Sequence, residues 1–443
     1  MPAALTPPAA AELLADARAR TLLLIAPVSE EDLRRQHDPL MGPILWDLGH
    51  IAHFEKLWLI DNLRGPPPPG GGRFRVRFGE MPGTFNPFEN PRRVRGQLEL
   101  PALGEVIDLL ADARRNVFEV LGNADLDGGS PLLCDGYVYR MVAQHEYQHG
   151  ETMLQTLQLK QGSPYSPPRA APVPVPRMTF GPGAMVRFPG GRVETGTFDR
   201  RAAYDNERPR HTVEVAPFDI DVAPVTNAEV LAFMRAGGYQ RRELWSDAGW
   251  AWLGEAGAEA PKYWVRDGDD WRARCMDRVF DVDTPTPVCH VCYHEAEAYA
   301  RFAGKRLPTE IEWEAAASWD PASETKHDYP WGDDEPGPLH ANLDQLTFST
   351  APIGAYPLNV SPIGCYGMIG DVWEWTSSDF NGYPDYESFP YPEYSEPFFG
   401  PEHKVLRGGS WATRPGAIRN TFRNWDYPIR RQIFSGFRCA RDA

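Results

Sequence analysis

The chain has 443 residues, 42% of them hydrophobic and 24% charged, and its 45 Lys and Arg against 61 Asp and Glu give a net charge of −16. This length suggests two or three domains, and the acidic balance leaves no broad basic face for phosphates, which disfavours nucleic acid as a partner. No apolar run approaches the roughly 20 residues of a membrane helix, and residues 1–20 lack a secretory signal, so we expect a cytoplasmic protein without a membrane span.

Residues 1–162 predict a helical first domain. Apolar residues recur at three- and four-residue spacing in four stretches, 9–26, 43–63, 103–122 and 137–159. Four helices of this kind predict a four-helix bundle. The Gly- and Pro-rich run at 65–72 cannot be helical and predicts an exposed loop.

After residue 162 the sequence pattern changes from helical periodicity to a proline-rich run followed by short strand-like segments, which marks a second domain. Six prolines fall in the fourteen residues 163–176, which predicts a semi-rigid linker over 163–178. Beyond it, 184–188 and 210–222 alternate like strands, and only 227–236, 294–303 and 309–318 have a helical pattern. Residues 179–443 therefore predict a compact α+β domain dominated by loops.

The strongest chemical signal is a pair of histidines in the fourth predicted helix. His145 and His149 are four residues apart, so both imidazoles lie on one helix face and can hold one metal ion. With Glu146 they also form the H-E-x-x-H pattern, in which the Glu acts as general base on a zinc-bound water. A chance pair on a solvated face is the alternative.

A third histidine is expected from the helix at 43–63. The apolar stripe of that helix favours His50 over His53 as the residue that faces the bundle core. Bundle interiors hold metal sites built from facing helices, so His50 would complete a three-histidine site with open positions. Such a site suits either zinc hydrolysis or Fe(II) that binds oxygen and substrate, and the pattern alone leaves both open.

Several longer motifs resemble known families. Through RQHDPLMGPILWDLGH and HEYQHGETML, the first half resembles the DinB-like helical domain of the ergothioneine-biosynthesis sulfoxide synthases, which are non-haem iron enzymes. Through PVTN, RLPTE, GDVWEW and LRGGSW, the second half resembles the formylglycine-generating-enzyme-like fold, a C-type-lectin variant. The resemblance spans nearly the whole chain, and it implies a multidomain protein with a DinB-like four-helix bundle followed by an α+β domain of that fold.

The resemblance also implies a reaction and its ligands. His50, His145 and His149 would bind Fe(II), where O2, a trimethylated histidine (hercynine) and a thiol meet to give a sulfoxide with a new bond from sulfur to the imidazole C2. By position, Gln148 would hold hercynine together with Asn424 and Trp425, since an indole face suits a quaternary ammonium.

The same resemblance assigns the thiol side of the site. In the type that uses γ-glutamylcysteine, an Arg and an Asp grip the thiol substrate; here they correspond to Arg92, with Arg95 as the alternative, and to Asp426. The proton-donating tyrosine of the family corresponds best to Tyr391. The same loop offers three other tyrosines, Tyr383, Tyr386 and Tyr394.

Further expectations and alternatives remain open on the sequence. Members of the second fold often hold structural calcium, for which Asn342 and Asp371 are candidates. The competing functions are a selenoneine synthase that takes a selenosugar, a zinc-dependent hydrolase or thiol transferase, and a binding module with a vestigial site. The sequence does not give the oligomeric state.

Overall fold

The computed structural model describes residues 5–64, 83–126, 130–167, 170–282 and 284–443. The predicted loop at 65–72 lies outside the described residues, as do positions 168 and 169 of the predicted linker. None of the described helices combines the length and the low polarity that crossing a bilayer requires.

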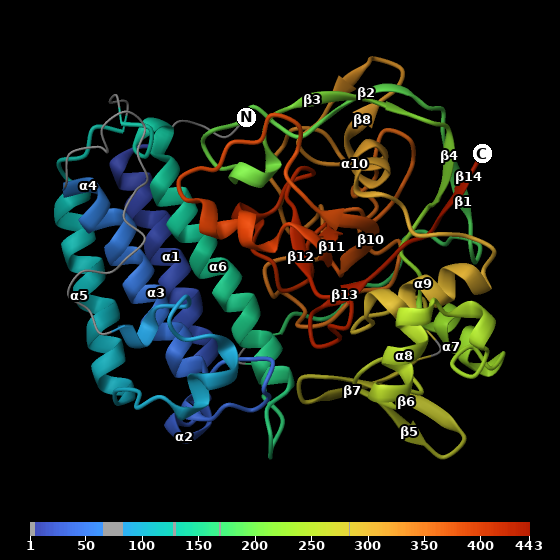
Figure 1. Ribbon diagram of the computed structural model, residues 1–443, viewed down its shortest axis with the longest axis horizontal. Coiled ribbons are helices and arrows are strands. Elements are labelled where there is room, and N and C mark those ends of the chain that lie inside the picture. Colours follow the sequence, from blue (N-terminus) through green and yellow to red (C-terminus); the bar gives the residue numbers. More distant parts are fainter. Residues whose placement is uncertain (1–4, 65–82, 127–129, 168–169, 283) are drawn as a thin grey trace.

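A bundle of four long helices forms the first domain, as predicted (Figure 1). The helices are α1 (Pro7–Ile25), α3 (Ile44–Lys56), α5 (Leu103–Leu121) and α6 (Tyr137–Gln158), and the shorter helices are α2 (Glu30–Arg34) and α4 (Asn62–Arg64). A π-helical turn, Leu57–Asp61, joins α3 to α4. Helix α3 packs against both α5 and α6, and α1 packs against α6. All twelve residues from Ile44 to Glu55 are buried, so α3 is the central helix of the bundle.

Local sequence explains where the first helix begins. Thr6 caps α1 by accepting a hydrogen bond from the Ala9 amide, and Pro7 occupies the first helical position, where its missing N–H costs nothing. Two short 3-10 helices, Gly83–Phe85 and Arg92–Gln97, lie between α4 and α5, and a third, Cys134–Gly136, precedes α6. The first two cover the side of α3 that carries His50, and their contacts with it are described below.

The second domain is α+β, as predicted. Its central sheet has the order β12-β11-β10-β13, in which the antiparallel neighbours β10 and β11 form the longest ladder. These strands are β10 (Trp373–Phe380), β11 (Gly400–Arg407), β12 (Asn424–Asp426) and β13 (Ser435–Gly436). A three-stranded sheet, β1-β4-β14, consists of β1 (Met185–Phe188), β4 (Phe218–Asp221) and β14 (Ala440–Asp442). The smaller sheets comprise β2 (Gly191–Thr195), β3 (His211–Val215), β5 (Trp264–Asp267), β6 (Asp270–Cys275), β7 (Arg278–Asp281), β8 (Trp319–Asp320) and β9 (Thr325–Lys326).

The expectation of only three helices in this domain was wrong. The predicted α7 (Asn227–Arg235), α9 (Tyr293–Phe302) and α10 (Glu310–Ser318) are present, but α8 (Asp247–Ala256) forms as well. Two glycines in ten residues, Gly249 and Gly254, lower the helix propensity of this segment. Tertiary packing overrides that propensity, because Ser246 caps the helix and Trp252 and Leu253 are buried.

The two domains meet along α6 (Figure 1). On this helix Glu151 is buried and accepts hydrogen bonds from three side chains of the second domain, at 2.7 Å from Trp373, 2.8 Å from Ser410 and 2.7 Å from Thr413. The helix that carries two of the predicted metal ligands is therefore fixed to the central region of the second domain.

Candidate metal centre and active site

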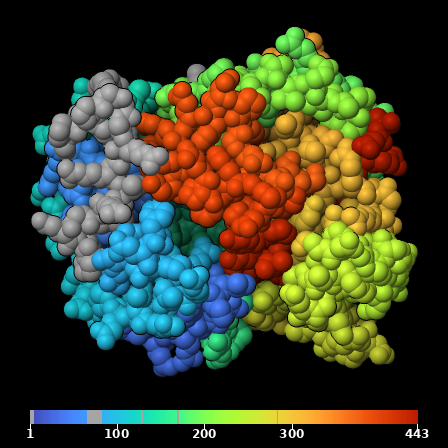
Figure 2. All heavy atoms as spheres, viewed as in Figure 1, coloured from blue at the N-terminus to red at the C-terminus, as the bar shows by residue number. Residues whose placement is uncertain are grey.

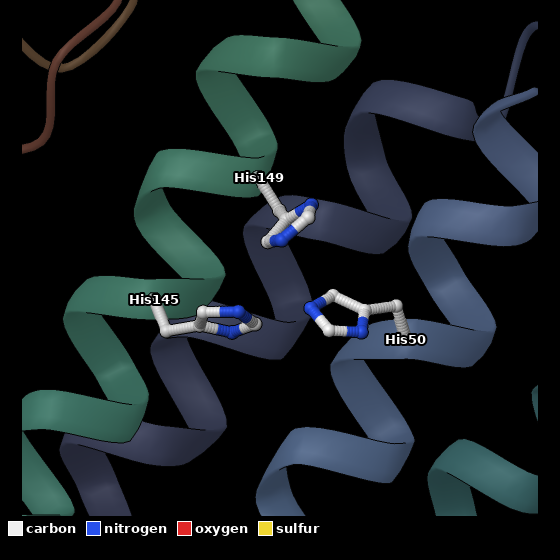
Figure 3. Close-up of side chains that lie close together, drawn as sticks. All are labelled: His50, His145 and His149. Atoms are coloured by element: carbon white, nitrogen blue, oxygen red, sulfur yellow. The ribbon is translucent and has the colours of Figure 1, made fainter. Parts of the chain in front are cut away.

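The structure brings three predicted metal ligands together between α3 and α6. His50 comes from α3, and His145 and His149 lie one turn apart on α6; Figure 3 shows their rings converging on one point. The nitrogens that could bind a metal all lie within 4.8 Å of one another. The ring centroids are 4.5 Å apart for His145 and His149, and 5.1 and 5.0 Å from each of these to His50. Three imidazoles with free positions form a site that fits a divalent metal.

Polar groups outside the cluster lie beside two of the three rings. The Nδ1 of His50 lies 2.9 Å from the Phe85 carbonyl, and the Nδ1 of His149 lies 3.2 Å from the Asp47 carboxylate. A hydrogen-bond partner of this kind fixes the tautomer and the ring orientation of a metal-binding histidine, so the Phe85 carbonyl leaves Nε2 of His50 for the metal. Asp47 was not predicted, although it lies three residues before His50 on the same helix and this spacing could have revealed it.

Burial keeps the ligands in the neutral form that binds metal. Desolvation, followed by the charge of His149, lowers the pKa of both His50 and His145 well below 6.5. The Phe54 ring stacks on His145 at 3.6 Å and closes that side of the cluster. His53, the alternative to His50, is also buried, but it is not a member of the cluster.

The acid of the H-E-x-x-H pattern does not take part in the site. Glu146 is buried in an ionic network with α1 and α5, where Arg18 lies 2.8 Å and Arg114 lies 3.5 Å from its carboxylate. Both arginines also bind Glu55, each at 2.6 Å. A carboxylate held by two guanidinium groups is not available as a base on metal-bound water, so this geometry opposes the zinc-hydrolase alternative.

Replacing Glu146 with Gln is expected to reduce stability and not turnover. Breaking a buried ion pair leaves the remaining charges uncompensated, at a cost of about 3 kcal/mol or more. Glu55→Gln breaks the same network from α3 and is the matched control. Chemical denaturation and the turnover of the folded fraction would check this; a Glu146→Gln variant of normal stability but without activity would restore the general-base role.

A cavity of about 600 Å³ lies between the two domains, and its lining includes Gln148, which precedes His149 on α6, but none of the three histidines. In Figure 2 the surface is hollowed between the segment around residues 85–100 and the C-terminal part of the second domain. All five predicted substrate-binding residues line this cavity: Arg92, Gln148, Asn424, Trp425 and Asp426. The bundle contributes the first two and β12 the last three, so the cavity exists only where both domains are in place.

Aromatic side chains form one wall of the cavity. Trp425 stacks on Phe380 at 4.1 Å and meets the edge of Tyr394 at 5.5 Å. The amide nitrogen of Gln148 lies 3.1 Å from the Tyr394 hydroxyl and 3.3 Å from that of Tyr204. Gln148, the residue before the candidate ligand His149, is thus held in place by two tyrosines of the second domain.

Charged side chains form the opposite end. The Asp426 carboxylate lies 3.2 Å from Nε of Arg430, which also lines the cavity and was not predicted. The charge of Asp426 acts on Arg92 as well. Arg95, the alternative to Arg92, lines the cavity too, so the structure does not choose between these two arginines. Arg430 could have been found from its spacing of four residues after Asp426.

The four candidate tyrosines occupy different positions. Tyr383 and Tyr386 bond to acids of the second domain, Glu314 at 3.4 Å and Asp205 at 2.8 Å. Tyr394 lines the cavity. Tyr391 lies deeper, stacked on Trp58 at 5.1 Å and at the edge of Phe54, the ring that covers His145.

The two candidate calcium ligands, Asn342 and Asp371, lie in contact, but they form a hydrogen bond with each other. The amide nitrogen of Asn342 donates to the Asp371 carboxylate at 2.7 Å, and the Ala351 amide donates to the same oxygen at 2.7 Å. Burial raises the pKa of Asp371 to about 7. A carboxylate that already accepts two hydrogen bonds and is easily protonated gives no support to the calcium prediction.

Comparison with known proteins matches both halves of this architecture. Residues 13–153 match the DinB superfamily, and residues 170–443 match the Sulfatase-modifying factor enzyme 1-like domain. The chain is 45% identical to the hercynine oxygenase of Mycolicibacterium thermoresistibile over 98% of this chain and 94% of the relative. It is 44% identical to that of Mycobacterium tuberculosis over 97% of each chain. The chain belongs to the hercynine oxygenase family.

Membership of the hercynine oxygenase family makes the protein an oxygenase and explains its two-domain architecture. The second domain alone is similar to the formylglycine-generating enzyme of Streptomyces coelicolor, with 36% identity over 63% of this chain and 95% of the relative. The relatives' names support neither the selenoneine synthase alternative nor the zinc hydrolase.

Proposed function

We propose that this protein joins hercynine to γ-glutamylcysteine in an O2-dependent reaction at Fe(II) bound by His50, His145 and His149. The observation that carries the proposal is a pair of neighbouring features: three imidazoles without a carboxylate ligand converge between α3 and α6, and Gln148, next to His149 in the chain, lines an interdomain cavity together with the amide, indole and charged groups of β12. Bound Fe(II) would supply the site at which O2 is activated and the thiol sulfur is held.

The overall reaction balances without a further reductant. The imidazole C2–H bond of hercynine and the S–H bond of the thiol break, and a C–S bond and an S–O bond form. One oxygen atom of O2 remains in the sulfoxide, and the other leaves as water with the two hydrogens. The four electrons that O2 requires therefore come from the two substrates.

The cavity wall suits hercynine at its aromatic end. Trp425 offers an indole face to the trimethylammonium group, and the amides of Gln148 and Asn424 can bond its carboxylate or imidazole. Gln148 precedes His149 on α6 and lines the cavity, which supports a hercynine site on the side of the cavity formed by that helix.

The charged end suits γ-glutamylcysteine, which carries two carboxylates and an ammonium group. Arg92 and Arg95 can bind the carboxylates, and Asp426 can bind the ammonium group. In this arrangement the donor would occupy the part of the cavity lined by the two arginines and Asp426.

Asp426→Asn is expected to raise the KM for γ-glutamylcysteine about tenfold, because a hydrogen bond to a charged group contributes about 1.5 kcal/mol or more. The KM for hercynine should change little. Asp379→Asn, which removes an acid paired with Lys404 on the same sheet, is the matched control. Steady-state kinetics with each substrate varied would check this, and an unchanged KM for γ-glutamylcysteine would remove the donor assignment.

We assign the two inner tyrosines different roles. Tyr391, near the ring that covers His145, is the proposed proton donor, and Tyr394 positions Gln148. Tyr391→Phe should therefore lower kcat about 100-fold, which is the usual contribution of a general acid, with KM nearly unchanged. Tyr394→Phe should mainly raise the KM for hercynine. Steady-state kinetics of both variants would check this assignment. A large fall in kcat for Tyr394→Phe with a raised KM for hercynine in Tyr391→Phe would mean that the two roles are exchanged.

The direct test is mass spectrometry of the products. The protein is loaded with Fe(II) without oxygen and then exposed to air with hercynine and equal amounts of γ-glutamylcysteine, cysteine and a selenosugar. The expected product is γ-glutamylcysteinyl hercynine sulfoxide. A selenium adduct would keep the iron site and overturn the donor, whereas no adduct with any donor would overturn the proposed reaction.

A further inference from the structure

A stack of three side chains connects the charged end of the cavity to the metal ligands. The guanidinium carbon of Arg95 lies 3.4 Å from the centre of the Trp46 ring. The His50 imidazole stacks on the same indole at 4.9 Å, with 13° between the ring planes. Arg95 lines the cavity and His50 belongs to the metal cluster, so Trp46 stands between the two.

Main-chain bonds hold this stack rigidly. The indole nitrogen of Trp46 donates to the Thr84 carbonyl at 2.6 Å, and the next carbonyl, that of Phe85, holds Nδ1 of His50 at 2.9 Å. Gly49 allows this approach: a Cβ at this position would lie 2.2 Å from the Phe85 ring. The segment that carries Arg95 and the helical turn that carries His50 are thus packed as one unit.

Arg95 is a buried cation whose nearest bonds do not neutralise it. Its Nε donates to the Asn90 carbonyl at 2.9 Å, a neutral acceptor. Burial lowers its pKa to about 10, partly against the charge of Asp47, so the side chain stays protonated at neutral pH. The Asp47 carboxylate itself faces His149. A desolvated guanidinium facing a cavity favours an anion, and its charge disfavours a metal cation close by.

We propose that Arg95 links the two binding events: an anionic ligand at the charged end of the cavity strengthens metal binding at the three histidines, and the metal strengthens binding of that anion. An anion on Arg95 removes the repulsion between this guanidinium and the metal, which Trp46 and His50 hold at a fixed separation. Reciprocity follows from thermodynamic linkage. The inference rests on the proposed function only in taking a γ-glutamyl dipeptide as the anion.

The test measures the Co(II) dissociation constant of the full-length protein with and without saturating γ-glutamylalanine, a donor analogue that has no sulfur to bind the metal. The analogue should tighten Co(II) binding by about fivefold or more, the usual lower range of coupling between sites. Arg95→Gln should bind Co(II) more tightly than wild type even without the analogue, and the analogue should add nothing. Arg92 does not stack on Trp46. The Arg92→Gln variant should therefore bind the analogue more weakly, but a saturating concentration of the analogue should still tighten its Co(II) binding as much as in wild type.

Two results would overturn the linkage: Co(II) binding by Arg95→Gln that is no tighter than wild type, or equal tightening by the analogue in both proteins. Should Arg95→Gln fail to fold, Arg95→Lys keeps the charge and should keep the coupling, and loss of coupling in that variant would equally contradict the proposal. Product formation by wild type, measured in parallel, distinguishes failure of the linkage from failure of the proposed function. Absence of product would contradict the proposed function, whereas a Co(II) dissociation constant that the analogue leaves unchanged would contradict only the linkage.

Discussion

A His149→Ala variant is expected to fold but to bind no stoichiometric metal, and its turnover should fall by at least about 1,000-fold. The metal would lose one of three ligands, and the two that remain cannot hold it at the same affinity. The same substitution removes the group that faces Asp47 and leaves that buried carboxylate near the empty position. Metal analysis after Fe(II) loading and gel filtration, together with turnover, would check this result.

Two further variants distinguish specific loss of metal binding from general destabilisation of the fold. Asp47→Asn keeps the three imidazoles but removes the negative charge that lies 3.2 Å from Nδ1 of His149, so metal affinity should fall about 10- to 100-fold. His53→Gln changes the other buried histidine of α3, which is not a member of the cluster, and should retain metal. Loss of metal from His53→Gln with retention in His149→Ala would contradict the ligand assignment.

The helical domain could be predicted almost completely because its apolar spacing is regular. The stretch at 137–159 corresponds to α6 (Tyr137–Gln158) within one residue at each end. The second domain was less predictable because long-range contacts determine its elements. Helix α8 forms despite two glycines, and β12 is a three-residue strand whose register depends on β11. Neither pattern is visible in a short window of sequence.

The candidate site shows the same division. The three histidines could be proposed from helical spacing and one apolar stripe, and the substrate-binding residues from the resemblance. What the sequence did not reveal were the groups that act on them: Asp47 beside His149, the Phe85 carbonyl beside His50, and Arg95 above Trp46. Phe85 and Arg95 lie in the 3-10 helices Gly83–Phe85 and Arg92–Gln97, far from α3 in the sequence, so their contacts with α3 follow from tertiary packing and not from periodicity.

The second large effect is expected at Glu151, the buried acid of α6 that bonds the second domain. Glu151→Ala leaves the indole donor of Trp373 without an acceptor, and of the Ser410 and Thr413 hydroxyls, 3.4 Å apart, only one can donate to the other. Each unsatisfied group costs about 1 to 3 kcal/mol, so we expect a stability loss of at least about 2 kcal/mol and a marked loss of activity, since the cavity between the domains depends on this contact. Chemical denaturation and kinetics would measure both.

Glu151→Gln is the matched control. The difference in stability between this variant and wild type is expected to depend on pH. Burial raises the pKa of Glu151 above its ordinary 4.5, although its three hydrogen bonds oppose the shift. The folded protein therefore binds this proton more tightly than the unfolded chain does, and the wild type loses stability as the pH rises from 4.5 through the folded pKa. Gln has no charge to desolvate and can still accept from Trp373 and Ser410. The stability of Glu151→Gln relative to wild type should thus increase as the pH rises from 4.5 through the folded pKa. If the wild type instead becomes more stable than Glu151→Gln as the pH rises, the ionised carboxylate itself stabilises the interface.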